Sequence, residues 1–270
     1  MKKDDAYYPS AFAANKYFQY FRYLIEFAKY NDWASIKSSF RLVLMGSAEK
    51  KQRIAKSRLG NFLIREGTTD FQFINYAYER KIRNYLKTNI NSFDVFIDIG
   101  ACIGEYCVWL AQHNKECYAF EPVPKNYIAL EENINLNNVK NKVKTYPYGL
   151  GEKEEEVLFE VMDSVTGSSH INRNNNISGE KIKIKELNNI LPESEINSEK
   201  RIILKMDVEG MEVDVLNGGH KFIERIKNLR VIYEHSFSGA DEIKNKLLKL
   251  GNFEFKHLDE YNMMATKKSS

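Results

Sequence analysis

The sequence has few cysteines, little net charge and no long hydrophobic run, and each absence excludes a class of protein. Its 270 residues contain three cysteines, Cys102, Cys107 and Cys117, without a Cys-x-x-Cys pair. We therefore expect buried free thiols in a reducing compartment, not a disulfide framework or a zinc site. No apolar run approaches the ~18 residues of a transmembrane helix, and no apolar signal-peptide core follows the charged start. We expect a cytoplasmic protein without a membrane span.

The charge balance argues against a nucleic-acid partner. Lys and Arg number 40 against 37 Asp and Glu, which leaves a net charge of +3 at pH 7. The basic residues are scattered among acidic ones, so no stripe or patch matches a phosphate backbone. Hydrophobic residues make up 43% of the chain, enough for the core of one large domain with an extension.

The first part of the chain is predicted to be helical and rich in aromatic residues. Residues 1–70 are assigned to an N-terminal extension, and residues 71–270 to the main domain. Apolar side chains recur there at spacings of three and four, which is typical of helix faces. These stripes are interpreted as packing on the main domain, with a dimer contact or a lid as the alternatives. The stripes consist of Tyr17, Tyr20, Phe21, Leu24 and Phe27, and of Trp33, Ile36, Phe40, Val43 and Leu44.

After Ser92, short apolar runs alternate with amphipathic segments. This alternation predicts an α/β domain whose parallel sheet is covered by helices on both faces. The expected strands are 95–98, 117–120, 143–146, 202–206 and 229–233, and the expected helices are 106–112, 124–136, 211–217 and 241–250. Residues 253–257 and 261–265 are predicted to form a closing hairpin.

Residues 152–200 interrupt that rhythm. Residues 154–161 alternate weakly, like a strand, and residues 181–185 alternate cleanly, which predicts a strand with one solvent-exposed face. The polar stretch 163–180 between them contains Ser168 and Ser169. Because long loops in compact domains are usually functional, this stretch is predicted to contact the substrate.

A glycine-containing loop follows the first predicted strand of the domain. It reads Asp98-Ile-Gly100-Ala101-Cys-Ile-Gly104. Gly100 permits a sharp turn, and Gly104 permits a close approach to a ligand. Glu121-Pro122 follows the next strand, where a carboxylate can accept hydrogen bonds from both hydroxyls of a ribose. The structural alternatives are a cap for Asp98 and a solvated strand end for Glu121.

Two cofactor classes match a glycine loop combined with a ribose-binding acid. A dinucleotide needs Gly-x-Gly-x-x-Gly around its pyrophosphate, whereas this loop has only Gly-x-x-x-Gly. Asp98 would repel a pyrophosphate, but it suits the ammonium and sulfonium of S-adenosylmethionine. The loop therefore favours S-adenosylmethionine over a nicotinamide dinucleotide.

The segment Lys205-Met-Asp-Val-Glu-Gly-Met-Glu212 is the most specific motif in the chain. Together with residues 93–106, 119–124, 133–137, 148–151 and 231–235, it resembles the FkbM family of methyltransferases over roughly residues 93–266. The resemblance implies a Rossmann-like class I methyltransferase sheet of seven strands, the last antiparallel. It also implies O-methylation of a hydroxyl on a polyketide or a surface glycan, and contact of Tyr106 with the cofactor. One departure is Cys102, where the family commonly has asparagine. We expect cofactor binding to persist, because backbone groups of the loop make most of the contacts with the cofactor.

Methyl transfer from a sulfonium needs a well-placed acceptor oxygen and a base. Asp207 is the first candidate to position the acceptor or cofactor, with Glu209 second, and His235 has a pKa suited to a base. Glu209 and Glu212 are alternatively explained as helix N-terminal acids, and His235 as a satisfied structural residue. Asp207 and Glu209 lack an obvious third ligand, so no metal site is predicted.

The acceptor is the least determined part of the prediction. The abundance of Lys and Asn points to an AT-rich bacterial genome, so a sugar of a surface glycan is preferred over another small molecule. The competing hypotheses are a nicotinamide-dependent oxidoreductase, against which the missing third glycine argues, and a non-catalytic assembly module or homo-oligomer built on the N-terminal helices.

Overall fold

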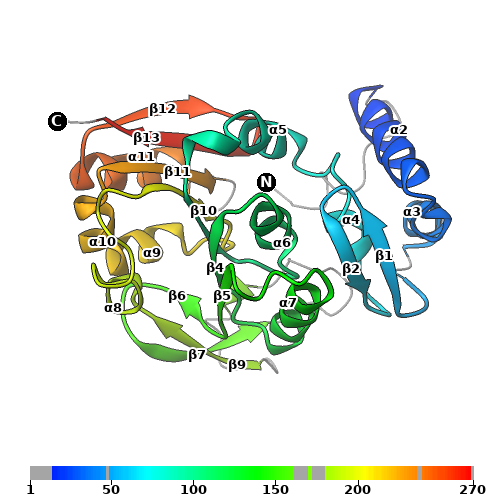
Figure 1. Cartoon of the computed structure of the whole chain (residues 1–270), viewed down its shortest axis with the longest axis horizontal. Coiled ribbons are helices and arrows are strands. Elements are labelled where there is room, and N and C mark those ends of the chain that lie inside the picture. The colour runs from blue at the N-terminus through cyan, green and yellow to red at the C-terminus, as the bar shows by residue number, and fades with distance from the viewer. Residues whose placement is uncertain (1–13, 47–48, 161–169, 172–179, 236–238, 269–270) are drawn as a thin grey trace. The chain divides into compact units, whose positions relative to one another are not determined.

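A computed structural model of the chain describes residues 14–46, 49–160, 170–171, 180–235 and 239–268. The chain divides into two compact units, one ending at Arg80 and one beginning at Lys81 (Figure 1). The first unit therefore extends beyond residue 70, where the sequence placed the domain boundary.

The first unit combines helices with a β-hairpin that the sequence did not predict. The expected helices are present as α2 (Ala14–Lys29) and α3 (Trp33–Met45). The strands β1 (Arg53–Ser57) and β2 (Gly60–Ile64) pair antiparallel around Arg58-Leu59. That dipeptide lacks the Asn-Gly or Asp-Gly signal of a tight hairpin, so the expectation of a helical extension is incomplete. The short helix α4 (Asp70–Phe73) follows the hairpin.

The second unit contains the predicted sheet. Its seven strands lie in the order β12-β13-β11-β10-β3-β4-β5. The last strand, β13, pairs antiparallel with β11 and β12, and the other pairs of the sheet are parallel, which confirms the predicted fold class. The strands are β3 (Val95–Ile99), β4 (Glu116–Phe120), β5 (Val143–Tyr146), β10 (Arg201–Met206), β11 (Asn228–Glu234), β12 (Phe253–His257) and β13 (Asn262–Lys267).

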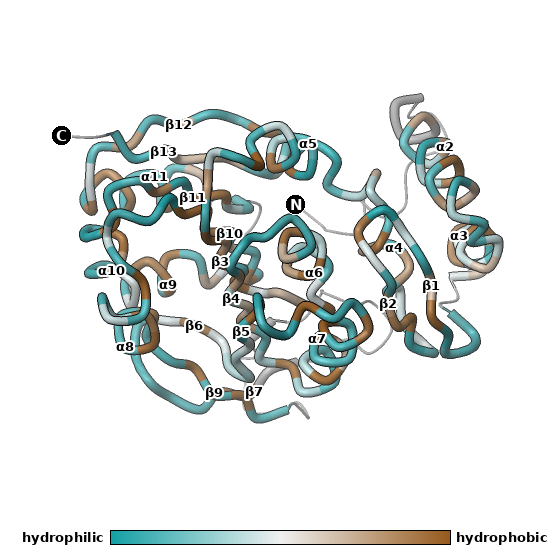
Figure 2. The backbone as a smooth tube through the Cα atoms, viewed as in Figure 1, coloured by the Kyte–Doolittle hydropathy of each residue, from teal (hydrophilic) through white to brown (hydrophobic). Residues whose placement is uncertain are grey.

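Helices cover both faces of this sheet. Hydrophobic side chains alternate with the pleat, so one face of β3, β10 and β11 packs against the helices of one layer and the other face against the second layer. Figure 2 shows the hydrophobic residues gathered along these three strands. One layer contains α8 (Leu187–Ile190), α9 (Glu212–Gly218), α10 (His220–Arg225) and α11 (Ala240–Leu250). The other layer contains α5 (Arg80–Thr88), α6 (Glu105–Gln112) and α7 (Pro124–Leu136). The 3₁₀ turn η1 (Ile90–Ser92) precedes β3.

A second, four-stranded sheet occupies the region where the sequence rhythm breaks. Its order is β6-β9-β7-β8. The predicted strands near 154–161 and 181–185 are confirmed within it, although their joining into a separate sheet was not predicted. Most of the polar stretch 163–180, including Ser168 and Ser169, lies outside the described residues. The strands are β6 (Gly149–Leu150), β7 (Glu155–Glu160), β8 (His170–Ile171) and β9 (Glu180–Lys185).

One smaller difference from the prediction concerns a helix. The predicted helix 211–217 corresponds to α9, which ends at Gly218, but the helix α10 that begins at His220 was not predicted. Its six residues are too few for a recognisable period. Among the described residues, no helix has both the length and the apolar character needed to cross a bilayer.

Candidate functional site

The candidate site lies at the edge of the main sheet where the parallel strands end. β4 lies on one side of β3 and β10 on the other, so the strand order reverses at β3. Ligands of open α/β sheets bind beyond the carboxyl ends of the strands at such a point. Asp98 is in register with Ala119 of β4 and Lys205 of β10, so the predicted motifs meet at one edge.

The glycine loop after β3 is held by backbone contacts on both sides. The amides of Gly100 and Ala101 donate to the carbonyl of Phe120 at 3.0 and 2.9 Å. Gly100 has φ +87°, and a Cβ atom there would lie 2.1 Å from the Asp207 carbonyl oxygen. A Cβ on Gly104, with φ +80°, would lie 2.2 Å from Leu130. The close neighbours that require glycine are therefore protein atoms, whereas the sequence analysis assigned the Gly104 approach to a ligand.

Glu121 joins this loop to the loop after β4. Its buried carboxylate accepts hydrogen bonds from the Cys102 amide and from the Val123 amide, both at 2.8 Å. These two donors orient the carboxylate between the loops. An anion so placed suits the hydroxyls of a ribose and would repel a pyrophosphate. The donor set therefore fits S-adenosylmethionine, as the sequence predicts. Pro122 lies between Glu121 and Val123 in the loop after β4.

The carboxylate of Asp98 is also buried, inside β3 and beneath the loop. The Cys107 thiol of α6 lies 3.8 Å from one of its oxygens. The predicted part that Asp98 plays in cofactor binding stays a prediction. The buried thiols Cys102, Cys107 and Cys117 are unoxidised in the structure.

Lys205 is a buried cation at the end of β10. Its ammonium lies 3.3 Å from the Asp207 carboxylate and 5.3 Å from the centre of the Tyr106 ring. A buried ammonium beside a half-buried carboxylate orients that carboxylate through charge-assisted hydrogen bonding. Lys205 is thus a candidate site residue that the predicted site did not include.

Tyr106 lies in the packing beneath the loop. Its ring stacks on Phe96 with centroids 6.0 Å apart, and the Arg83 guanidinium lies 5.2 Å from it. The ring thus contacts protein groups and is buried, and its contact with a cofactor stays a prediction. Arg83 also lies 3.9 Å from Glu105, and both side chains are buried. Burial raises the pKa of Glu105 to about 8, against the opposing effect of Arg83.

The segment after β10 is a turn with strained backbone angles, and a backbone hydrogen bond joins it to the glycine loop. The Asp207 amide donates to the Ile99 carbonyl at 3.0 Å. Glu209 has φ +52° and Gly210 has φ +100°, and such backbone strain in a non-glycine residue is concentrated at functional sites. The Glu212 carboxylate accepts long hydrogen bonds of 3.4 Å from the amides of Val208 and Gly210. Glu212 therefore stabilises the turn in addition to beginning α9.

His235 follows β11, the neighbour of β10. Its amide donates to the Tyr261 carbonyl, and its ring lies edge-on to His257 with centroids 6.2 Å apart. The buried Nε2 atom has no hydrogen-bond partner among the described residues. The structure therefore puts His235 at the same sheet edge as Asp207 and Glu209, on the adjacent strand. Its role as a base stays a prediction.

Two apolar groups beside Glu121 were not foreseen from the sequence. Phe120 stacks on Tyr146 at 4.6 Å, and Tyr146 contacts Tyr148 at 5.6 Å. Their aromatic character carries no signal of a site, because strand residues of this kind usually belong to the core. The second group connects β9 of the smaller sheet to the loops after β4 and β10, and it consists of Val123, Val157, Ile182, Ile184 and Met211.

A cavity of about 450 Å³ lies elsewhere, at the start of the parallel strands. Asp94, Glu116 and Val143 line it together with several lysines. These residues precede or begin β3, β4 and β5, so the cavity is at the opposite edge of the sheet from the glycine loop and is separate from the candidate site.

Comparison with known families and proteins adds a sequence relationship to this geometry. Residues 98–262 match the model of the methyltransferase FkbM domain. The chain is 26% identical over 144 residues to Methyltransferase 1 of Beauveria bassiana, a match that covers 45% of this chain and 57% of that protein. The chain thus spans little more than half the length of that relative.

Solved structures show weaker similarity. The FkbM methyltransferase of Methylobacillus flagellatus aligns with a TM-score of 0.46 and 14% identity, over 72% of this chain and 54% of that one. A SAM-dependent methyltransferase of Agrobacterium tumefaciens aligns with a TM-score of 0.48 and 11% identity, over 82% of this chain and 71% of that one.

Proposed function

The chain belongs to the FkbM methyltransferase domain family, and on that premise we propose that it transfers a methyl group from S-adenosylmethionine to a hydroxyl. The observation that carries the proposal is Glu121, a buried carboxylate oriented by the amides of Cys102 and Val123 at the switch point of the sheet. The sulfonium of the cofactor supplies the electrophilic methyl group when bound.

Each element of the site has a part in this reaction. Glu121 accepts the ribose hydroxyls, while the acidic side chain of Asp98 favours a cationic ligand beside the glycine loop. Asp207, oriented by Lys205 at 3.3 Å, positions the acceptor hydroxyl. Glu209 and His235 are the further candidates for removing its proton. Because in-line displacement depends on alignment, fixing the acceptor against the loop contributes much of the rate.

We propose a sugar hydroxyl of a surface glycan or polysaccharide as the acceptor, with a polyketide or another small-molecule hydroxyl as the alternative. Support for a sugar comes from the family resemblance and the composition, not from a contact in the site. Turnover with labelled S-adenosylmethionine against nucleotide sugars, glycans and polyketide alcohols separates these classes.

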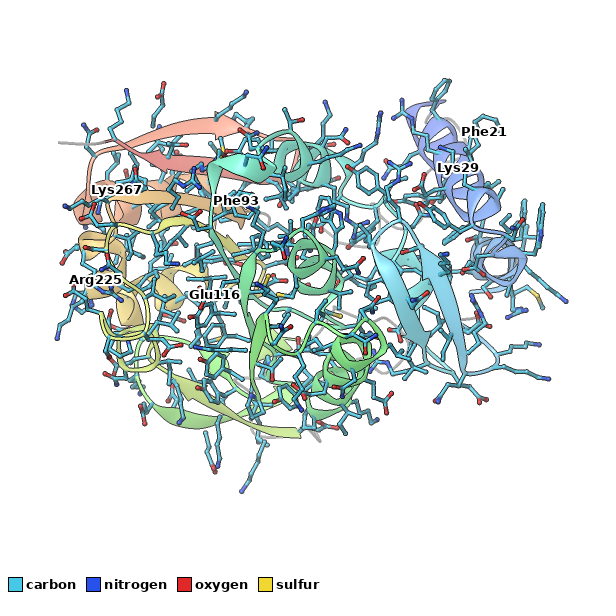
Figure 3. All side chains as sticks on the ribbon, viewed as in Figure 1. Phe21, Lys29, Phe93, Glu116, Arg225 and Lys267 are labelled. Carbon is cyan, nitrogen blue, oxygen red and sulfur yellow. The ribbon has the colours of Figure 1, made fainter. Side chains whose placement is uncertain are left out.

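Calorimetry with S-adenosylmethionine tests the cofactor assignment. Glu121→Gln removes a charged acceptor, so its affinity is expected to fall about 10- to 100-fold, as for other hydrogen bonds to charged groups. Glu116→Gln is the matched control, because Glu116, labelled in Figure 3, begins β4, whereas Glu121 follows the end of that strand. If folded wild-type protein binds no S-adenosylmethionine, or the two variants lose equal affinity, the proposal is wrong.

The same assays divide the roles among the acids. Asp98→Ala is expected to weaken cofactor binding, whereas Asp207→Ala is expected to lower turnover with little change in cofactor affinity. Equal loss of cofactor affinity in both variants would contradict this division.

A further inference from the structure

The helix α3 of the first unit has its polar face inside and its apolar face outside. Ser35 and Ser38 are buried, the first bonded to Asp32 and the second to Glu49. Trp33, Phe40 and Leu44 recur at helical spacing on the opposite face. Their side chains are 65%, 53% and 78% exposed. An ordinary surface helix has the reverse arrangement.

The helix α2, which packs against α3, adds a second exposed apolar face. Phe18, Phe21 and Ile25 lie on one side of it and are 66%, 60% and 40% exposed. Lys29 lies along the same side of the helix, as Figure 3 shows for Phe21 and Lys29. We name the exposed faces of α2 and α3 together the basic–apolar surface.

The charges on this surface have one sign. The two acids of α2 and α3 are buried and paired within the unit: Glu26 lies 3.0 Å from Arg58, and Asp32 lies 3.0 Å from Arg53. Lys29 reaches Glu26 only at 3.7 Å and is itself half exposed. On these two helices, as far as their side chains are described, every charged group that faces solvent is therefore a cation. The cations are Arg22, Lys29, Lys37 and Arg41.

We propose that the basic–apolar surface binds the surface of an anionic lipid bilayer. Aromatic and aliphatic side chains on an amphipathic helix enter the headgroup boundary, and neighbouring Lys and Arg attract anionic lipids. A twofold dimer would place the same surface against itself, which would bring its cations together. The charge pattern therefore favours an anionic lipid surface over a second copy of the chain.

The two tryptophans make the binding measurable without a label. Trp33 is 65% exposed on the basic–apolar surface, whereas Trp109 is 4% exposed in the core of the second unit. Vesicles of phosphatidylcholine with an equal share of phosphatidylglycerol are expected to shift the emission of Trp33 to shorter wavelength and to carry the full chain upward in a flotation gradient. Vesicles of phosphatidylcholine alone are expected to do neither, and added salt to weaken the binding.

Charge-changing variants then locate the contact. Lys37→Gln is expected to weaken partitioning into anionic vesicles roughly fivefold, the contribution of one cation near such a surface. Phe21→Glu and Leu44→Glu are expected to weaken it further. Ile128→Glu is the matched control, since Ile128 is 59% exposed but lies on α7, and it should bind as wild type. All four variants should retain wild-type affinity for S-adenosylmethionine.

Three results would overturn the proposal. They are equal binding to neutral and anionic vesicles, no binding to either, and a dimer in light scattering that Phe21→Glu dissociates while vesicle binding is absent. The last result would assign the surface to a second copy of the chain.

Discussion

The contact between the glycine loop and the Asp207 turn leads to a sharp test with Gly100→Ala. The added Cβ would lie 2.1 Å from the Asp207 carbonyl oxygen, whereas Cβ atoms essentially never approach a heavy atom closer than 3.0 Å. The obstacle is backbone, so no side chain can rotate away. The two turns must separate by about 1 Å, a distortion of the kind that costs 1–3 kcal/mol in a packed site.

The strained backbone angle adds a second cost, which a control can remove. Gly100 has φ +87°, and an alanine there costs roughly 1–2 kcal/mol for conformation alone. Gly67 has φ +77° with nothing within 4 Å of its added Cβ, so Gly67→Ala carries only that second cost. We expect a loss of unfolding free energy of about 2–5 kcal/mol for Gly100→Ala against about 1–2 kcal/mol for Gly67→Ala.

Urea denaturation measures both losses, and turnover measures the functional consequence. A displacement of about 1 Å between the cofactor loop and the acceptor turn is expected to lower turnover roughly 100-fold, while Gly67→Ala stays active. Equal destabilisation by the two substitutions would refute the reasoning, because it would mean that the glycine loop and the Asp207 turn can separate without a cost in free energy.

Three further substitutions test other parts of the second unit. The folded-state pKa of Glu105 is raised to about 8, so between about pH 4.5 and 8 the native state holds a proton that the unfolded state has lost. The free energy of unfolding of the wild type should therefore fall by up to roughly 5 kcal/mol over that pH range. In Glu105→Gln this fall of the unfolding free energy with pH should vanish, as measured by urea denaturation at several pH values. An unchanged fall would contradict the raised pKa of Glu105. Cys102 has φ +50°, a conformation that asparagine tolerates, so Cys102→Asn should raise the free energy of unfolding by roughly 0.5 kcal/mol; destabilisation would argue against this. Lys267 donates hydrogen bonds to three carbonyls at the end of α10, so Lys267→Met should lower the free energy of unfolding by about 1–3 kcal/mol. Lys268→Met removes only an ion pair on the surface and should lower it by under about 1 kcal/mol. Similar losses for the two lysines would contradict the capping role.

The sequence predicted the main sheet well because its signals are local. The buried strand β3 is an almost continuous apolar run, which is the pattern expected of a central parallel strand. The strand 143–146 and the helix 124–136 also have the bounds that the alternation predicts. The hairpin at Arg58-Leu59 was missed because its turn lacks glycine or asparagine in the loop itself. The six residues of α10 were missed because they make fewer than two turns.

The sequence identified candidate side chains for the site but not the backbone groups that hold them. Asp98, Gly100 and Glu121 were chosen because their spacing is characteristic, and the structure brings them to one edge of the sheet. The amide of Cys102 and the amide of Val123, which hold Glu121, carry no sequence signal, since every residue except proline has such a donor. The contact of Lys205 with Tyr106 joins β10 to α6, two elements far apart in the chain, and periodicity does not reveal such a contact.

The hydrogen bond from the Asp207 amide to the Ile99 carbonyl has a consequence for how such a protein changes during evolution. The glycine loop and the Asp207 turn, to which we assign the methyl donor and the acceptor in the proposed function, behave as one rigid part, because Gly100 leaves no space between them. A substitution that alters the backbone of residues 208–210 must therefore be matched by one in residues 100–103. We expect these two short segments to vary together among relatives, so that a new acceptor is accommodated by side chains that extend from the turn and not by movement of the turn.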